Sequence, residues 1–506
     1  MLNRIVFYKP ILRILFLSFI LGIINCSPPS YNNACELGSK TFVNNFIITT
    51  VGLKRDSYCG IVNSATAAAN AAAANGGLAM TGFSFTDAAN GLSKTYTGTI
   101  TGTNIAIDIP YGKLTTAIPT ISTNAAVIQA GTATVVSGVT VLDFTNPVTF
   151  TLISSNGSKL VYTVTAYAIT PVADTGQTNC FNYGTWVASC SSVSASFPNQ
   201  DGELQNFPNA KGVQPPATNS AYPNDPINRD ILKGIVWKTC HEGQTGLTCA
   251  GAATGLNHAS ATTACNNLNT VNSGAGYAGL KNWRLPTIQE LNQLMEFNGS
   301  TNNTNYWNPS LFPNPPPSNA APYAWSSSLL LPAGTSAMSH NDQYVTNTAT
   351  STSNRAHCVN GITPPAFDMV DNGDGTILDK RTKLIWQKCA LGQANDASCT
   401  GTPSLQNWSN SLLGCKNLAL AGKAWRLPNV NEMVTLFDLT LTTTQKVNST
   451  LFPNFTAATQ YYDTSTGNQQ NLAYTQMLTP SSPSFQGVSG RGAGTNYNAR
   501  CVAGPE

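Results

Sequence analysis

The sequence has few charged side chains and few of the residues that catalysis uses most often. Charged residues make up 10% of the 506 residues, and only four are histidines, whereas an average soluble domain is about 25% charged. No Walker loop, Gly-x-Ser-x-Gly elbow or zinc ligand set occurs with suitable spacing. The formal net charge is only +3, whereas nucleic acids require clustered Lys and Arg. These absences argue against an enzyme and against a nucleic-acid partner.

Long apolar runs are missing except near the N-terminus. Residues 1–25 carry three basic side chains, no acid and the apolar run 14–21. The run is too short to span a bilayer, so the pattern predicts a secretory signal peptide. The residues before Cys26 resemble a relaxed bacterial lipobox, although Asn25 replaces the usual small residue and Ile23 replaces Leu. The resemblance implies diacylglycerol on Cys26, and the alternative is an ordinary signal peptide with an incidental cysteine.

Cysteine, by contrast, is abundant, with 13 copies in the chain. Removing Cys26 leaves an even number, as oxidised secreted domains usually have. Removing residues 1–25 also leaves a mature chain with no net charge. We therefore expect a protein of the cell envelope, held on the outer membrane by its lipid and exposed at the surface.

Residues 26–170 divide into a tether and a β-rich region. Residues 26–78 are expected to form a lipidated tether in which Cys35 and Cys59 pair. Residues 79–170 contain six or seven short alternating runs separated by turn residues, which predicts an all-β antiparallel sandwich. The pattern resembles bacterial immunoglobulin-like modules of surface proteins, for which a spacer role is the default.

Residues 233–506 contain an internal repeat. Residues 233–240 match 382–389, and residues 283–287 match 425–429. Four cysteines recur in the same order in each copy, which predicts a disulfide framework. They are Cys240, Cys249, Cys265 and Cys358 in the first copy, and Cys389, Cys399, Cys415 and Cys501 in the second.

Each copy is expected to contain two helices. The first covers 260–268 in one copy and 408–418 in the other. The second follows Trp-Arg-Leu-Pro, where Thr287 stands three residues before Glu290 and Asn429 three residues before Glu432. This spacing predicts capping boxes.

The two glutamates could also be catalytic acids, but capping and the helix dipole explain them. Arg284 and Arg426 are expected to be internal ion-pair partners.

The pattern Trp…Cys…Trp-Arg-Leu-Pro-[Thr/Asn]-x-x-Glu…Phe-Pro…Arg-Cys-Val resembles the Lcl C-terminal domain family, named after the C-terminal domain of a bacterial collagen-like adhesin. Its core is also similar to sulfatase-modifying enzymes and C-type lectin-like folds. The resemblance implies two α+β C-type-lectin-like domains stapled by disulfides. We call them repeat 1 (171–362, with a lead-in) and repeat 2 (363–506). By analogy, the implied disulfides are Cys265–Cys358, Cys415–Cys501, Cys240–Cys249, Cys389–Cys399 and Cys180–Cys190.

Candidate ligand contacts are few. Asp371, Asp374 and Asp379 could supply oxygen ligands to calcium, but a β-turn explains their loop equally well, and no other cofactor is expected. Aromatic residues of the loop-rich half of each repeat are candidate binding residues, although core packing would equally explain Trp325. The candidates are Tyr306, Trp307, Tyr323, Tyr461 and Tyr462.

We therefore expect an adhesin-like lipoprotein whose tandem modules bind a matrix protein or a glycan with avidity. One alternative is a structural envelope lipoprotein without an external ligand. The other is an enzyme of the sulfatase-modifying type, for which the chain lacks convergent catalytic groups.

Overall fold

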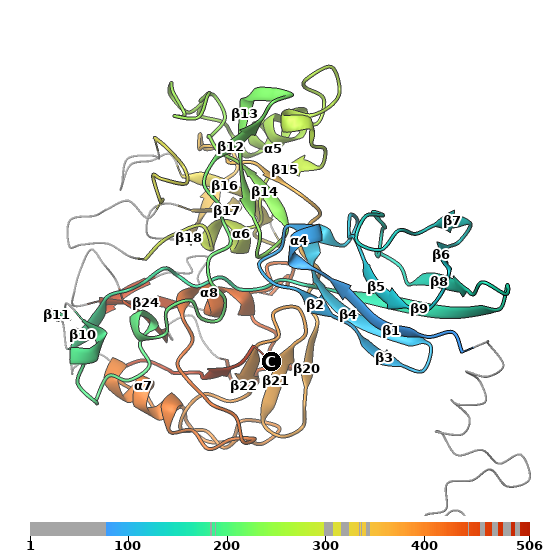
Figure 1. Cartoon of the computed structure of the whole chain (residues 1–506). Coiled ribbons are helices and arrows are strands. Elements are labelled where there is room, and N and C mark those ends of the chain that lie inside the picture. The colour runs from blue at the N-terminus through green and yellow to red at the C-terminus, as the bar shows by residue number, and fades with distance from the viewer. Residues whose placement is uncertain are drawn as a thin grey trace, which may run out of the picture. The chain divides into compact units, whose positions relative to one another are not determined.

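Figure 1 shows the computed structural model of the chain, which consists of several β-sheets with few, short helices. The structure describes residues 77–505 except for short gaps, and in this part no helix is long and apolar enough to cross a membrane. The gaps are 183–184, 188, 298–306, 315–322, 333, 335, 341–344, 444, 456–460, 468–473, 479–486 and 491–495. The chain divides into a smaller unit (Met1–Thr81, Thr123–Thr134 and Phe150–Tyr162) and a larger unit (Gly82–Ser122, Val135–Thr149 and Thr163–Glu506).

The smaller unit contains an antiparallel ladder. In it β6 (Val127–Ala130) pairs with β7 (Ala133–Thr134) and with β8 (Val148–Ile153). Phe150 and Leu152 are buried while their neighbours along β8 are more exposed. This is the alternation of a strand with one face on a core, as the sequence pattern predicts.

The N-terminal part of the larger unit is also β-structure. β4 (Asn104–Pro110) pairs antiparallel with β3 (Thr99–Thr101) and parallel with β9 (Lys159–Ile169). The parallel pair departs from the expected antiparallel sandwich, because side-chain alternation carries no information on strand direction. The other elements here are β1 (Met80–Phe85), α4 (Asp87–Asn90), β2 (Tyr96–Thr97), η1 (Tyr111–Lys113) and β5 (Thr120–Thr123).

The two repeats share one plan, in which a tryptophan-bearing strand pairs with the strand after the last cysteine. Trp237 of β14 (Ile235–Lys238) pairs with Val359 of β19 (Val359–Asn360), and Trp386 of β22 (Ile385–Gln387) pairs with Val502 of β26 (Val502–Ala503). These pairs belong to sheets with the order β12-β13-β14-β19-β15 in repeat 1 and β20-β21-β22-β26 in repeat 2. Each repeat adds a three-stranded sheet, β16-β17-β18 or β23-β24-β25.

The strands of repeat 1 are β12 (Ala217–Asn219), β13 (Tyr222–Asp230), β14 (Ile235–Lys238), β15 (Trp283–Arg284), β16 (Ala324–Leu329), β17 (Ser336–His340), β18 (Val345–Ala349) and β19 (Val359–Asn360). Those of repeat 2 are β20 (Met369–Asp371), β21 (Thr376–Asp379), β22 (Ile385–Gln387), β23 (Tyr462–Gly467), β24 (Tyr474–Leu478), β25 (Gly487–Gly490) and β26 (Val502–Ala503). The lead-in to repeat 1 contains β10 (Cys180–Asn182), β11 (Thr185–Val187), η2 (Cys190–Ser192) and η3 (Asp201–Glu203).

The helices are equivalent in the two repeats as well. The first helices are α5 (His258–Asn267) and α7 (Trp408–Lys416), and the second are α6 (Ile288–Asn292) and α8 (Val430–Met433). Both expected capping boxes are present at the starts of α6 and α8. Short 3-10 turns complete the set, η4 (Tyr277–Gly279) in repeat 1 and η5 (Val434–Leu436) after α8.

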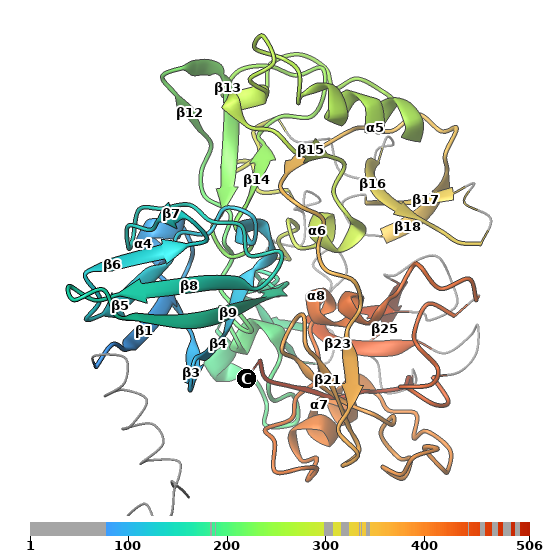
Figure 2. The same ribbon diagram turned by 90° about the vertical axis from the view of Figure 1, so that its right-hand side faces the viewer.

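One hydrophobic core extends through both repeats. It contains buried residues of α6, such as Leu291, and of α8, such as Met433. Figure 2 shows α6 and α8 facing each other between repeat 1, in green and yellow, and repeat 2, in orange and red. The side-chain amide of Asn292 donates to Oδ1 of Asn431 across 2.8 Å. The repeats are therefore packed as one body.

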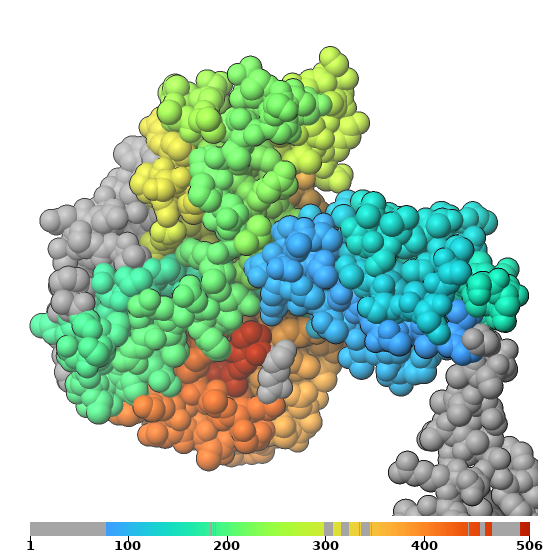
Figure 3. All heavy atoms as spheres, viewed as in Figure 1, coloured from blue at the N-terminus to red at the C-terminus, as the bar shows by residue number. Residues whose placement is uncertain are grey.

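The lead-in is held by both repeats. Gln293 of repeat 1 accepts from the backbone N–H of Ala173, and Asn431 of repeat 2 donates to the carbonyl of Ala173. Further along, Gln177 donates to and accepts from the backbone of Gly467. Figure 3 shows lead-in atoms, in teal and green, packed on those of repeat 2, in orange and red.

Candidate functional site

A cavity of about 400 Å³ lies between the two repeats. Its walls include several residues between 287 and 293 around α6, several between 327 and 331 of repeat 1, residues 364–367 at the start of repeat 2, and three residues between 435 and 440. The volume lies within the range of about 300–1,000 Å³ that is typical of small-molecule sites. The cavity depends on both repeats, so no single copy of the sequence pattern could reveal it.

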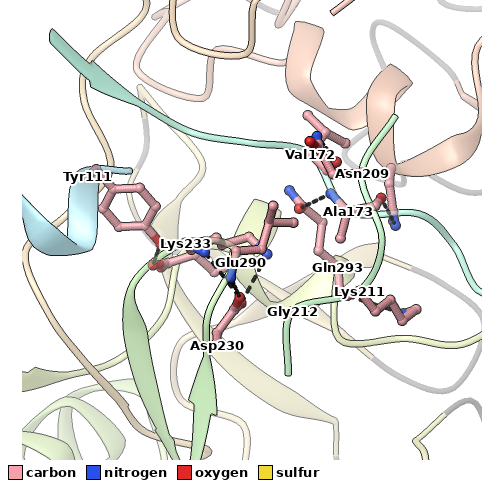
Figure 4. Close-up of polar contacts among 12 residues, drawn as sticks. Tyr111, Val172, Ala173, Asn209, Lys211, Gly212, Asp230, Lys233, Glu290 and Gln293 are labelled. Carbon is pink, nitrogen blue, oxygen red and sulfur yellow. Dashed lines mark hydrogen bonds and ion pairs between the residues drawn. The ribbon is translucent and has the colours of Figure 1, made fainter. Parts of the chain in front are cut away.

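Glu290 is a carboxylate in the cavity wall that accepts hydrogen bonds from several different groups. Its Oε1 accepts from the Tyr111 hydroxyl at 2.6 Å and from Arg284 at 2.7 Å, and its Oε2 accepts from the backbone N–H of Thr287. Burial is the largest single influence and acts to raise the pKa of this carboxyl, but Arg284, Tyr111 and the Thr287 N–H together lower the pKa overall. Figure 4 shows Tyr111 directed at Glu290. Glu290 is therefore a charged cap and ion-pair partner.

Tyr111 itself lies outside the repeats, 179 positions before Glu290. Its ring is fully buried. Burial and the neighbouring carboxylate together raise its phenolic pKa well above the usual value. The hydroxyl thus remains protonated and acts as a hydrogen-bond donor.

Glu432 occupies the equivalent place in repeat 2. It is fully buried, pairs with Arg426, and accepts from the backbone N–H of Asn429 at 2.9 Å. The Arg426 guanidinium also lies 4.5 Å from the ring centre of Phe207 in the lead-in. Both arginines of the Trp-Arg-Leu-Pro motif are thus internal ion-pair partners, as expected.

The other charged residues lining the cavity are also paired. Lys233 donates to Asp230 at 3.1 Å, and Arg381 donates to Asp379 at 2.9 Å. All four side chains are at least nine-tenths buried. Figure 4 shows Lys233 directed to Asp230. The charges at this cavity are therefore balanced within the protein.

Phe367, near the start of repeat 2, supplies an aromatic wall to the cavity. It is half-buried, and the Arg381 guanidinium lies 3.8 Å from its ring centre. This cation–π contact fixes the position of the ring. Uncharged polar side chains line the same space, among them Gln289, Ser327 and Thr440.

Of the five aromatic binding candidates, two are core residues in the structure. Trp307 is 1% exposed, and Tyr462 is fully buried and stacks on Phe455 with ring centres 4.3 Å apart. Aromatic area stabilises most when it is buried against other rings, which explains both placements. Tyr461 is 38% exposed and Tyr323 is half-buried. Tyr306 lies outside the described residues.

Trp325, for which core packing was the alternative, is fully buried and donates to the carbonyl of Leu256 at 2.8 Å.

The three aspartates considered for calcium each have a different neighbour. Asp371 accepts from Lys388 at 2.7 Å, Asp374 accepts from Thr376 at 2.6 Å, and Asp379 pairs with Arg381. Within the described residues no three His, Cys, Asp or Glu side chains form a group that could hold a metal ion.

The fold also brings together two buried histidines that no sequence pattern connects. The rings of His241 and His357 lie 4.8 Å apart, in contact with Trp237, Trp307 and Phe312. Burial lowers the pKa of His241 to about 3 and that of His357 well below its usual value. Their separation along the chain, more than a hundred positions, gave no spacing signal.

The structure contains five disulfides, and they join the same pairs that the family resemblance implies. They are Cys180–Cys190, Cys240–Cys249, Cys265–Cys358, Cys389–Cys399 and Cys415–Cys501. All cysteines of the described part are thereby oxidised. Cys26, Cys35 and Cys59 lie outside it.

Comparison with known families gives two matches. Residues 81–166 match the family described as SGBP, N-terminal. Residues 227–360 and 375–503 each match the Lcl C-terminal domain, and together they make up just over half of the chain. Comparison with curated proteins and with solved structures gave no match. The chain therefore belongs to the Lcl C-terminal domain family.

Proposed function

We propose that this protein is a lipid-anchored protein of the cell envelope that binds a glycan outside the cell. The observation that carries the proposal is the cavity between the repeats, which has an aromatic wall and uncharged polar side chains. The matches to the SGBP N-terminal and Lcl C-terminal domains also favour a surface protein that binds carbohydrate. The repeats would adopt the C-type-lectin-like fold expected from the sequence.

The repeats would act as one rigid binding body. Because α6 and α8 share a core and the Asn292–Asn431 bond, the geometry between the two modules is fixed. Glycan binding would then use both repeats at once, in contrast to two modules on a flexible linker.

The first experiment measures binding of residues 27–506, produced oxidised, to a panel of glycans and matrix proteins. We expect saturable binding to at least one glycan. A reduced and alkylated sample is the matched control and should lose binding, because the disulfides stabilise the fold within each repeat. Binding to a matrix protein alone, or no binding by correctly oxidised protein, would contradict the proposal.

A second experiment tests the envelope assignment. The variant Cys26→Ser should lose labelled-lipid incorporation and membrane association, while the control variant Cys35→Ser should keep both. Protease added to intact cells should cleave the wild-type protein if it faces outward. Protection of the wild-type chain under those conditions would support the structural envelope role instead.

A further inference from the structure

We infer that the cavity between the repeats binds an uncharged sugar, with Phe367 as its stacking platform. The inference rests on the proposed glycan-binding function and adds to it the location of the site and the chemical class of the ligand.

The charge balance of the cavity excludes an anionic ligand held by ion pairs. Lys233 is paired with Asp230, and Arg381 with Asp379, in bonds of 3.1 and 2.9 Å between buried side chains. Glu290 is likewise paired with Arg284. A sulfate or carboxylate would have to break one of these pairs and leave a buried carboxylate alone, which is strongly unfavourable.

The polar side chains that remain suit hydroxyl and acetamido groups. Nε2 of Gln289 donates to the carbonyl of Phe437 at 3.2 Å, which directs the amide and leaves its Oε1 as an acceptor at the cavity. The Ser327 and Thr440 hydroxyls lie on exposed residues of the lining. The Ser327 hydroxyl donates to the carbonyl of Pro286 and the Thr440 hydroxyl donates to Asp438, so both present acceptor lone pairs to the donors of a sugar.

The apolar wall suits the C–H face of a pyranose ring. Phe367 is flanked by Pro364, Pro365 and Ala366, and all four line the cavity. The Arg381 guanidinium near the ring centre orients the aromatic side chain before any ligand arrives. An apolar wall with a few placed polar groups is the usual composition of a small-molecule site.

The experiment measures affinity for uncharged glycans and for heparin with four forms of the oxidised chain: wild type, Phe367→Ala, Ala366→Trp and Tyr461→Ala. Phe367→Ala removes the platform, and Ala366→Trp fills the cavity from an exposed position. We expect both to weaken binding of an uncharged glycan at least tenfold. Tyr461→Ala, an exposed aromatic in repeat 2 that does not line the cavity, should change it less than twofold.

The salt dependence provides a second readout. Affinity for an uncharged sugar should change less than about twofold between low and high salt, because screening acts on charges. Wild-type binding to heparin alone, with steep salt dependence, would overturn the inference but not the proposed function. So would glycan binding that neither cavity variant alters, whereas no glycan binding at all would overturn both. Unchanged thermal unfolding of Ala366→Trp shows that its loss of binding is not a loss of fold.

Discussion

The side-chain amide of Asn292, at the end of α6 in repeat 1, donates a hydrogen bond to Oδ1 of Asn431, in α8 of repeat 2, across 2.8 Å. Both side chains are at most 1% exposed. The Nδ2 of Asn431 in turn donates to the backbone carbonyls of Ala173 and Asp174. One asparagine thus connects repeat 1, repeat 2 and the lead-in.

Replacing Asn431 by Ala should therefore be costly. The change removes three buried hydrogen bonds, one from the Asn292 amide on α6 and two to the carbonyls of Ala173 and Asp174 in the lead-in. A buried group that loses its hydrogen bond costs about 1–3 kcal/mol. We expect the free energy of unfolding in urea to fall by about 3 kcal/mol. The control Asn266→Ala, at an exposed position on α5, should leave the midpoint unchanged, and an equal effect of both variants would contradict the prediction.

A second prediction concerns the ion pair at the cavity. Glu290→Gln deprives a guanidinium with only 17% of its side chain exposed of its anionic partner, and breaking a buried pair costs about 3–5 kcal/mol. Tyr111→Phe removes only one donor to the same carboxylate and should cost about 1.5–3 kcal/mol. Chemical denaturation would measure the free energy of unfolding of both variants, and Glu290→Gln should lose more of it than Tyr111→Phe.

The control for this pair is Asp368→Asn. Its partner is Lys380, and both side chains are about half exposed. Solvent and salt screen such a pair, so no measurable change is expected. A larger effect of Asp368→Asn than of Glu290→Gln would refute this account of the cavity.

The third prediction concerns pH and the buried histidines. Burial is the main cause of the low pKa of His357, and His241 and Lys238 add to it. The unfolded chain takes up a proton near pH 6.5, while the folded chain does not. The stability that depends on a neutral His357 is therefore lost as the pH falls below about 6.5.

The variant His357→Phe should be free of this loss. As the pH falls from about 6 to about 4.5, the free energy of unfolding of the variant should rise relative to that of the wild type by about 1.4 kcal/mol for each pH unit. Comparing differences is necessary because burial raises the pKa of Asp201 and Asp463 to about 7, which works in the opposite direction. A pH-independent difference would show that His357 is protonated in the fold.

A fourth prediction separates long-range from short-range disulfides. Cys415–Cys501 joins positions 86 apart, and Cys389–Cys399 joins positions 10 apart. If chain entropy governs their effect, paired replacement by serine should cost about 4–5 kcal/mol for the first and about 3 kcal/mol for the second. Denaturant midpoints of the two double variants would measure the difference, and the reverse order would exclude loop entropy as its main cause.

Features with a local spacing were predictable from the sequence. Thr287 and Glu290 stand three residues apart, so their capping box could be predicted, and it is present in the structure. The internal repeat was predictable as well, because the same motifs and cysteines recur in the same order in both copies. Strand direction carries no such signal, and the parallel pairing of β4 with β9 was missed.

The candidate site was less predictable, because its parts meet only in the folded chain. Phe367 lies at the start of repeat 2, between the two segments that match the family, and Tyr111 lies in the preceding β region. Conversely, Trp307 and Tyr462 are aromatic residues of the kind that often contacts ligands, but both are buried in the core. An aromatic in a loop-rich segment has the same sequence signature whether it faces solvent or core.

The position of the lead-in between the repeats also has a consequence for biogenesis. Gln177 bonds to Gly467, 290 positions later in the chain. During synthesis the N-terminal half emerges first, and it cannot complete these contacts until almost the whole chain has been made. Such distant contacts slow folding, since loop closure must precede the gain from each contact. Until then the nascent chain exposes the apolar surface of α6 that packs in the core shared with α8, and such exposed surface makes a folding intermediate prone to aggregation.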